Sequence, residues 1–195
     1  MIKIVHHVNT LDQFNGLDPT YGVEMDVHAF GKRLVVQHDA LQEGPELSDW
    51  LTVCGKRFVI FNIKEEGVET KVIELAKKSG VTDYFLLDLS FPALIRQVRK
   101  GESRVAVRVS EYELLECALL LESKIEWVWL DCFEGFPLSR GEFQRLQNSR
   151  LKVCLVSPEL HGPPRGKNDI VSFQNTMQSY DAKVDAVCTK FPELW

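Results

Sequence analysis

Short, almost uninterrupted hydrophobic runs recur along the 195-residue chain, with segments of helical periodicity between them. Phe58-Val-Ile-Phe61 is one such run. Strands that are buried on both faces have this pattern, and they belong to parallel sheets. We predict eight of them, at residues 3–7, 22–27, 58–64, 84–89, 105–109, 127–131, 152–157 and 185–189, with a further extended segment at 34–38.

Amphipathic segments between these strands predict helices. Ser139 with Glu142 three residues later forms a capping box, and Ser90 is a candidate cap before Pro92. The predicted helices cover residues 47–53, 68–78, 92–100, 113–121, 139–146 and 169–180. The Gly/Pro-rich segment 161–167 is predicted to be a loop.

Eight strands that alternate with helices predict an α/β fold, a compact (β/α)8 TIM barrel formed as a single domain by residues 1–195. The alternative is an open, doubly wound sheet. Neither GxGxxG nor GxxxxGKS, the motifs that mark the first turn of such sheets, occurs in the sequence.

Composition argues against several classes of partner. The formal net charge is -5, and no basic run suggests a nucleic-acid footprint. No apolar stretch approaches the roughly 20 residues that span a bilayer, and the N-terminus lacks a signal-peptide layout. Five widely spaced cysteines without a CxxC pair favour free thiols and a cytoplasmic location. The oligomeric state is left open.

Two carboxylates two residues apart, Glu24 and Asp26, stand among apolar neighbours in the second predicted strand, and so point to one face. Two such carboxylates repel each other unless a cation joins them. Carboxylate oxygens, with the amide oxygen of Asn62, suit Mg²⁺ or Ca²⁺. The alternative is an amphipathic strand whose acids face solvent.

Histidine and lysine side chains flank this pair. His6 and His38 each end an extended run and could transfer protons near neutral pH. His7 has the opposite strand parity to His6, which weakens its case. Lys64 is predicted to need a negative partner, either these carboxylates or a substrate phosphate. The alternative places Lys64 in the charged turn Lys64-Glu-Glu66.

The order of these residues resembles the signature of the glycerophosphodiester phosphodiesterases, within the superfamily that includes phosphatidylinositol-specific phospholipase C. The resemblance rests on Gly22-Val-Glu-Met-Asp-Val27 and Leu34-Val-Val-Gln-His-Asp39, with His6-His7 similar to the family's His-Arg-Gly. It implies a TIM barrel that cleaves phosphodiesters with a divalent metal ion. The implied roles are metal binding by Glu24, Asp26 and Asn62, acid–base catalysis by His6 and His38, and phosphate binding by Lys64.

The chain departs from that pattern at three points. His7 replaces the arginine that grips phosphate, Asn62 replaces a metal-binding glutamate, and the glutamate of Glu-Asn-Thr before Asn9 is missing. We assign His7, Arg108 and Lys190 to substrate binding, although Arg108 could instead form an ion pair with Asp88 or Asp131.

The predicted function is therefore a phosphoric diester hydrolase, a metal-assisted phosphodiesterase for a small, glycerophosphodiester-like substrate. Two alternatives stay open. One is a ligand-binding barrel that has lost turnover, and the other is a metal-dependent lyase that acts on a sugar acid or sugar phosphate.

Overall fold

The computed structural model describes residues 1–162 and 165–195. Its elements form two compact units, which are described separately. The N-terminal unit is Ile4–Val105, and the C-terminal unit is Met1–Lys3 with Ala106–Trp195. Strand β1 (Ile2–Val5) contributes residues to both units.

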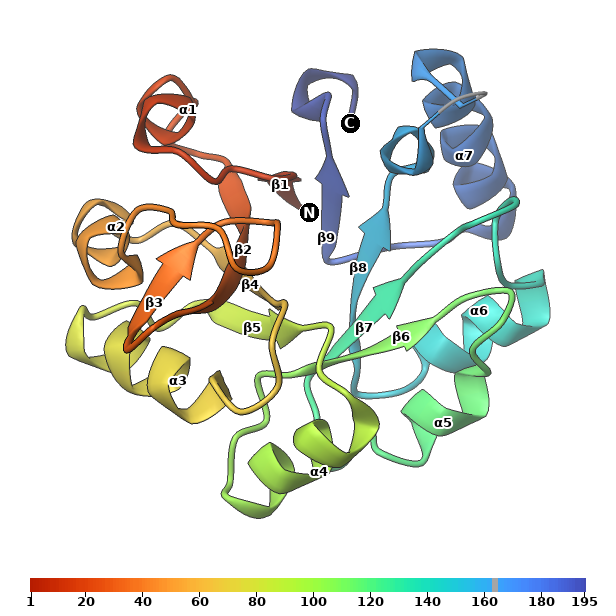
Figure 1. The fold of residues 1–195 in the computed structure, drawn as a ribbon. Helices are drawn as coiled ribbons and strands as arrows, with labels where there is room; N and C mark the ends of the chain where they lie inside the picture. Colours follow the sequence, from red (N-terminus) through yellow and green to blue (C-terminus); the bar gives the residue numbers. More distant parts are fainter. Residues whose placement is uncertain (163–164) are drawn as a thin grey trace. The chain divides into compact units, whose positions relative to one another are not determined.

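The N-terminal unit contains parallel strands in the order β5-β4-β2-β1, with β3 antiparallel to β2 (Figure 1). Its strands after β1 are β2 (Gly22–Phe30), β3 (Arg33–Val36), β4 (Val59–Ile63) and β5 (Tyr84–Leu87). Its helices are α1 (Leu11–Asn15), α2 (Leu47–Val53), α3 (Glu69–Lys78) and α4 (Phe91–Arg99).

The C-terminal unit contains parallel strands in the order β9-β8-β7-β6, and the Ile2 amide of β1 donates a 2.7 Å hydrogen bond to the Asp185 carbonyl. Its strands are β6 (Ala106–Val109), β7 (Trp127–Leu130), β8 (Lys152–Val156) and β9 (Ala186–Thr189). Its helices are α5 (Leu115–Leu119), α6 (Arg140–Gln147), α7 (Lys167–Tyr180) and the 3₁₀ helices η1 (Pro158–His161) and η2 (Pro192–Leu194).

The fold class is the predicted (β/α)8 barrel, because parallel strands alternate with helices along the whole chain. Each of the eight strands forms within two residues of its predicted bounds, apart from β2, which continues to Phe30 and pairs with β3 through a hairpin. The strands read as unbroken hydrophobic runs because they are buried on both faces. In β2 and β4, both alternating sets of side chains are buried.

The helices follow the predictions less closely. Ser90 and Ser139 cap α4 and α6 as expected, but α5 is shorter than predicted and α1 was not predicted. In the predicted loop 161–167, His161 ends η1 and Lys167 begins α7, while residues 163 and 164 lie outside the described part of the chain.

Gly22 begins β2 where backbones approach closely. A Cβ atom at this position would lie 2.9 Å from the Phe58 carbonyl oxygen, just before β4. Only glycine permits this approach, which sets where β2 starts and therefore where Glu24 and Asp26 lie.

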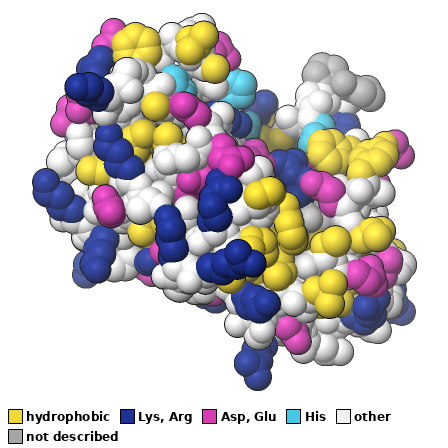
Figure 2. Space-filling model, turned by 60° about the horizontal axis from the view of Figure 1, so that its bottom comes forward, with side chains coloured by type: hydrophobic (Ala, Val, Ile, Leu, Met, Phe, Trp, Pro, Cys, Tyr) yellow, Lys and Arg dark blue, Asp and Glu magenta, His cyan; other side chains and the backbone are white. Residues whose placement is uncertain are grey.

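The surface carries charges of both signs. On the face drawn in Figure 2, lysine and arginine side chains are interspersed with acidic and hydrophobic ones. Across the described residues, every helix is too short or too polar to cross a bilayer.

Candidate active site

The carboxylates of Glu24 and Asp26 are buried in β2, with relative exposures of 1% and 2%. Strand β2 lies between β1 and β4, so its side chains meet residues from both neighbours. The alternative of solvent-facing acids is therefore wrong. The register places Asp26 opposite Asn62 in β4, so the side-chain amide of Asn62 lies in the same site as the two carboxylates.

Glu24 accepts hydrogen bonds through both carboxylate oxygens. Asn62 Nδ2 donates to Oε1 at 2.9 Å, and the His7 amide donates to Oε2 at 2.6 Å. The His6 ring is also close, with Nε2 3.7 Å from Oε2. Burial, followed by the charge of Asp26, raises the pKa of Glu24 to about 7. Without a cation, the site therefore resists carrying two negative charges.

Asp26 is held by a reciprocal pair of hydrogen bonds. Asn9 Nδ2 donates to Asp26 Oδ2 at 2.7 Å, and the Asp26 amide donates to Asn9 Oδ1 at 3.0 Å. The other carboxylate oxygen, Oδ1, lies 3.1 Å from Lys64 Nζ. Lys64 also lies 4.0 Å from Asp88, so its ammonium group faces these acids and not only its charged turn.

His7 enters the site through its backbone conformation. Strand β1 ends at Val5, and His7 has a φ of 61°, in the left-handed region that non-glycine residues rarely adopt. This turn brings His7 Nε2 to 3.5 Å from Asp26 Oδ2. The parity argument against His7 is wrong, because strand alternation stops before this residue. Asp88, after β5, also has a positive φ, of 59°. Two strained residues beside one carboxylate pair are typical of a functional site.

His38 lies at the outer edge of this group. Its side chain is 54% exposed, and Nδ1 lies 2.9 Å from Asp39 Oδ1. Its ring centroid lies 5.4 Å from that of His7. Seven of the nine predicted site residues are thus linked in the N-terminal unit: His6, His7, Glu24, Asp26, His38, Asn62 and Lys64.

Asn9 was not among the predicted site residues. It is buried, and its amide satisfies both the side chain and the backbone of Asp26. The signal was present in the sequence, because Asn9-Thr10 follows the two histidines as the family's Asn-Thr does.

Replacing Asn9 with alanine should destabilise the protein by about 1–3 kcal/mol, because a buried carboxylate oxygen and a buried amide lose their partners. Urea unfolding measures the effect. The exposed Asn15 in α1 provides the control, and Asn15→Ala should change stability by no more than ~0.5 kcal/mol. Equal effects would contradict the assigned role of Asn9.

The donor set fits a hard divalent cation. Asn62 Oδ1 is buried and has no hydrogen-bond partner among the described residues, although Asn62 Nδ2 has one. An unpaired buried oxygen costs free energy unless something else binds it. With two carboxylates beside it, this oxygen completes the all-oxygen environment that Mg²⁺ and Ca²⁺ prefer.

The raised pKa of Glu24 predicts how stability depends on pH without metal. Between about pH 4.5 and 7 the folded protein holds a proton that the unfolded chain has released, so stability falls as pH rises. The loss should be about 2–3 kcal/mol. Urea unfolding in a chelator would measure it, with Glu24→Gln as the control that lacks this slope. Identical pH profiles for the two proteins would contradict the burial of an ionisable Glu24.

The two remaining predicted residues belong to the C-terminal unit. Arg108 Nη1 lies 2.5 Å from Asp131 Oδ2, and Arg108 Nε lies 3.8 Å from Glu113 Oε1. Arg108 thus forms the ion pair with Asp131 that was the alternative to phosphate binding. Lys190 follows β9 with an exposed side chain, and its amide donates to the buried Glu159 at 3.0 Å.

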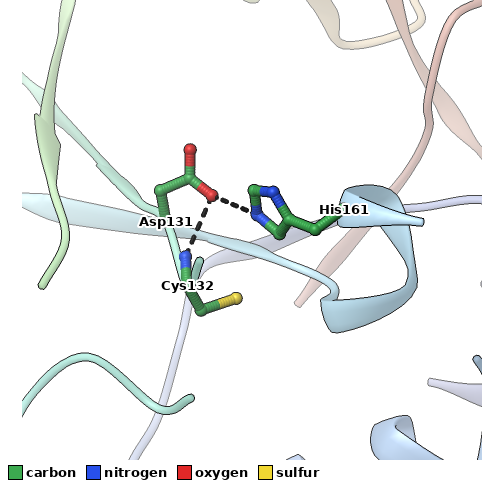
Figure 3. A group of neighbouring side chains, drawn as sticks. All are labelled: Asp131, Cys132 and His161. Carbon is green, nitrogen blue, oxygen red and sulfur yellow. Dashed lines mark hydrogen bonds and ion pairs between the residues drawn. The ribbon is translucent and has the colours of Figure 1, made fainter. Parts of the chain in front are cut away.

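Asp131, Cys132 and His161 form a second group of potential metal ligands, all in the C-terminal unit (Figure 3). His161 Nε2 lies 2.7 Å from Asp131 Oδ1, and the Cys132 thiol donates to the Val156 carbonyl at 3.0 Å. A Cys/His/Asp set suits Zn²⁺ better than Mg²⁺ or Ca²⁺. This group was not predicted, because residues 131 and 161 are 30 positions apart in the sequence.

Comparison with solved structures identifies the fold. The structure of a glycerophosphodiester phosphodiesterase from Agrobacterium tumefaciens superposes with a TM-score of 0.67 at 17% identity, over 100% of this chain and 99% of that one. The chain has the glycerophosphodiester phosphodiesterase fold. A putative glycerophosphodiester phosphodiesterase from Galdieria sulphuraria is similar, with a TM-score of 0.69, 14% identity, and 99% and 95% coverage.

A third glycerophosphodiester phosphodiesterase fold, from Parabacteroides distasonis, matches at a TM-score of 0.67 and 12% identity, over 99% of this chain and 84% of that one. No protein-family model matches the sequence, and no curated protein does. The likeness to glycerophosphodiester phosphodiesterases therefore rests on the fold.

Proposed function

We propose that this chain is a metal-assisted phosphodiesterase that cleaves a small, glycerophosphodiester-like substrate. The observation that carries the proposal is the buried pair Glu24 and Asp26, contacted by His6, His7, Asn62 and Lys64. The solved structures that share this fold are of proteins named for the same activity, which supports it.

Glu24, Asp26 and Asn62 would hold the divalent cation. Mg²⁺ or Ca²⁺ bound there would supply positive charge against the non-bridging phosphate oxygens as negative charge develops on them. Without the cation, Asn62 Nδ2 and Lys64 Nζ partly neutralise the two carboxylates. These contacts keep the carboxylates oriented in the metal-free protein.

His6 and His38 would transfer the protons, one from the attacking hydroxyl or water and the other to the leaving group. His6 lies next to Glu24, and His38 is oriented by Asp39 through Nδ1. Between them lies the ring of His7, within 5.8 Å of His6 and 5.4 Å of His38 between centroids. We propose that His7 contacts the substrate phosphate in place of the family's arginine.

Lys64 would stabilise the phosphoryl charge. Its ammonium group lies at the edge of the carboxylate pair and is half-buried, which strengthens its interaction with an anion. Lys190 is the proposed substrate-binding cation of the C-terminal unit. The 2.5 Å contact of Arg108 with Asp131 favours a structural role for Arg108.

A screen of phosphodiesters with Mg²⁺, Ca²⁺ or Mn²⁺, followed by phosphorus NMR, tests the proposal. We expect metal-dependent conversion of a glycerophosphodiester to a phosphate monoester or a cyclic phosphate. Metal binding without turnover of any diester would favour the ligand-binding alternative. Turnover of a sugar acid or sugar phosphate alone would favour the lyase.

We also propose a cytoplasmic location. All five cysteines are free and four of them are buried. Free thiols of this kind are usual in a reducing compartment.

A further inference from the structure

Two buried acids, Asp131 after β7 and Glu159 after β8, have their charges compensated by nearby donors. Asp131 accepts from Arg108 at 2.5 Å, from His161 at 2.7 Å and from the Cys132 amide at 2.9 Å. Glu159 in η1 accepts from Thr189, the Lys190 amide and Ser157. Asp131 therefore already has two side-chain donors, Arg108 and His161.

His161 and Arg165 both follow β8, four positions apart in the sequence. Both contact the same dipeptide at the end of β7: His161 bonds to Asp131, and Arg165 Nη1 donates to the Cys132 carbonyl. Among the described residues, His161 Nδ1 has no hydrogen-bond partner, and neither do Nε and Nη2 of Arg165. The His161 side chain is 22% exposed, so a ligand can reach its free nitrogen.

Two exposed aromatic rings form a chain of contacts that starts at His161. The Phe133 ring centroid lies 4.8 Å from that of His161, and the Tyr112 ring lies 5.9 Å from that of Phe133. Phe133 and Tyr112 are 39% and 68% exposed. An apolar surface beside a cationic cluster suits a ligand that is anionic at one end and apolar at the other.

We propose that His161 and Arg165 form a binding site for a phosphate monoester. The dianion contacts the imidazolium and guanidinium groups, and the organic group packs on Phe133 and Tyr112. Arginine binds phosphate through several donors at once. The site lies wholly within the C-terminal unit, and it does not depend on the proposed hydrolase function.

The hydrogen bonds dictate the protonation of the bound state. Because Nε2–H of His161 donates to the Asp131 carboxylate, Nδ1 must also carry a proton to bind an anion. The charged groups around this ring are Asp131 just after β7, Arg108 on β6 through Asp131, and Arg165 four residues beyond His161. Glu111 and Glu159 act on the adjacent Cys132.

A metal ion fits the Asp131, Cys132 and His161 group less well. Arg108 already occupies the second oxygen of Asp131, and the Cys132 thiol donates to the Val156 carbonyl. Burial, together with the charge of Asp131, raises the pKa of the Cys132 thiol, which opposes the thiolate that a metal requires.

Histidine NMR of the full chain in a chelator tests the site. The His161 ring signals, assigned with His161→Gln, should shift saturably with phenyl phosphate and with inorganic phosphate. Phenyl phosphate should bind more tightly than inorganic phosphate. Because no turnover is measured, the result is separate from that of the diester screen.

Arg165→Gln should weaken binding about tenfold, whereas Arg150→Gln, an exposed change of equal charge in the same unit, should have less than about a twofold effect. Phe133→Ala should weaken binding of phenyl phosphate but not of inorganic phosphate. Unmoved His161 signals at millimolar ligand, or equal effects of the two arginine variants, would overturn the proposal. So would perturbation of His161 by Zn²⁺ and not by phosphate.

Discussion

Replacing His6 or His38 with alanine is expected to lower turnover of an unactivated diester by about 10²–10⁴-fold, the range typical of a lost general acid or base. The His6 ring lies beside the buried Glu24, and the His38 ring lies next to that of His7, with Nδ1 near Asp39. Steady-state kinetics with a glycerophosphodiester at saturating metal measure the loss.

The leaving group separates the two roles. An aryl leaving group needs no protonation, so it should rescue the variant that lacks the acid but not the variant that lacks the base. Lys64→Ala should lose activity with every leaving group, because Lys64 acts on the phosphoryl charge. Lys56→Ala, an exposed lysine in the same unit, is the matched control. Near-full activity of both histidine variants with all diesters would rule out this mechanism.

Glu24→Gln is expected to abolish divalent-ion binding, and with it turnover, while leaving the metal-free protein as stable as the wild type or more so near neutral pH. The introduced amide can keep the hydrogen bond from the His7 backbone through its oxygen. Its nitrogen can then donate to Asn62 Oδ1, which has no partner among the described residues, once the Asn62 amide rotates by 180°. Removal of the buried charge adds stability, because the pKa of Glu24 is raised.

Asp26→Asn should behave differently although it removes the same charge. Both oxygens of Asp26 have donors, Lys64 and Asn9, and Asn9 is fixed by its second bond to the Asp26 amide. The amide nitrogen introduced by Asp26→Asn would therefore face either Lys64 Nζ or Asn9 Nδ2, and two donors cannot form a hydrogen bond with each other. We expect loss of metal binding together with about 1–3 kcal/mol of stability. Calorimetry and urea unfolding of both variants test this pair, and unchanged metal binding in both would show that the site is misassigned.

Much of the fold could be predicted from the sequence, because strands buried on both faces need unbroken hydrophobic runs. Such runs located all eight strands. Glu24 and Asp26 stood out because they are charged residues within one of these runs. Short helices were harder. Helix α1 has five residues and depends on a capping box between Thr10 and Gln13, so it has almost no periodicity to detect.

The site was predictable wherever strand alternation holds. Asn62 lies opposite Asp26 because β4 is regular. Alternation failed for His7, whose left-handed backbone follows the end of β1. The Asp131–His161 pair depends on chain folding across 30 positions, which no local pattern encodes.

The most direct test of the central claim is phosphorus NMR of a glycerophosphodiester mixed with the wild-type protein or Glu24→Gln, each with Mg²⁺ or Ca²⁺ and with a chelator. The claim is that the buried Glu24 and Asp26 pair forms a metal-assisted phosphodiesterase site. We expect a phosphate monoester or cyclic phosphate to form only with the wild type and metal. Equal conversion by Glu24→Gln, or conversion that persists in the chelator, would contradict the claim.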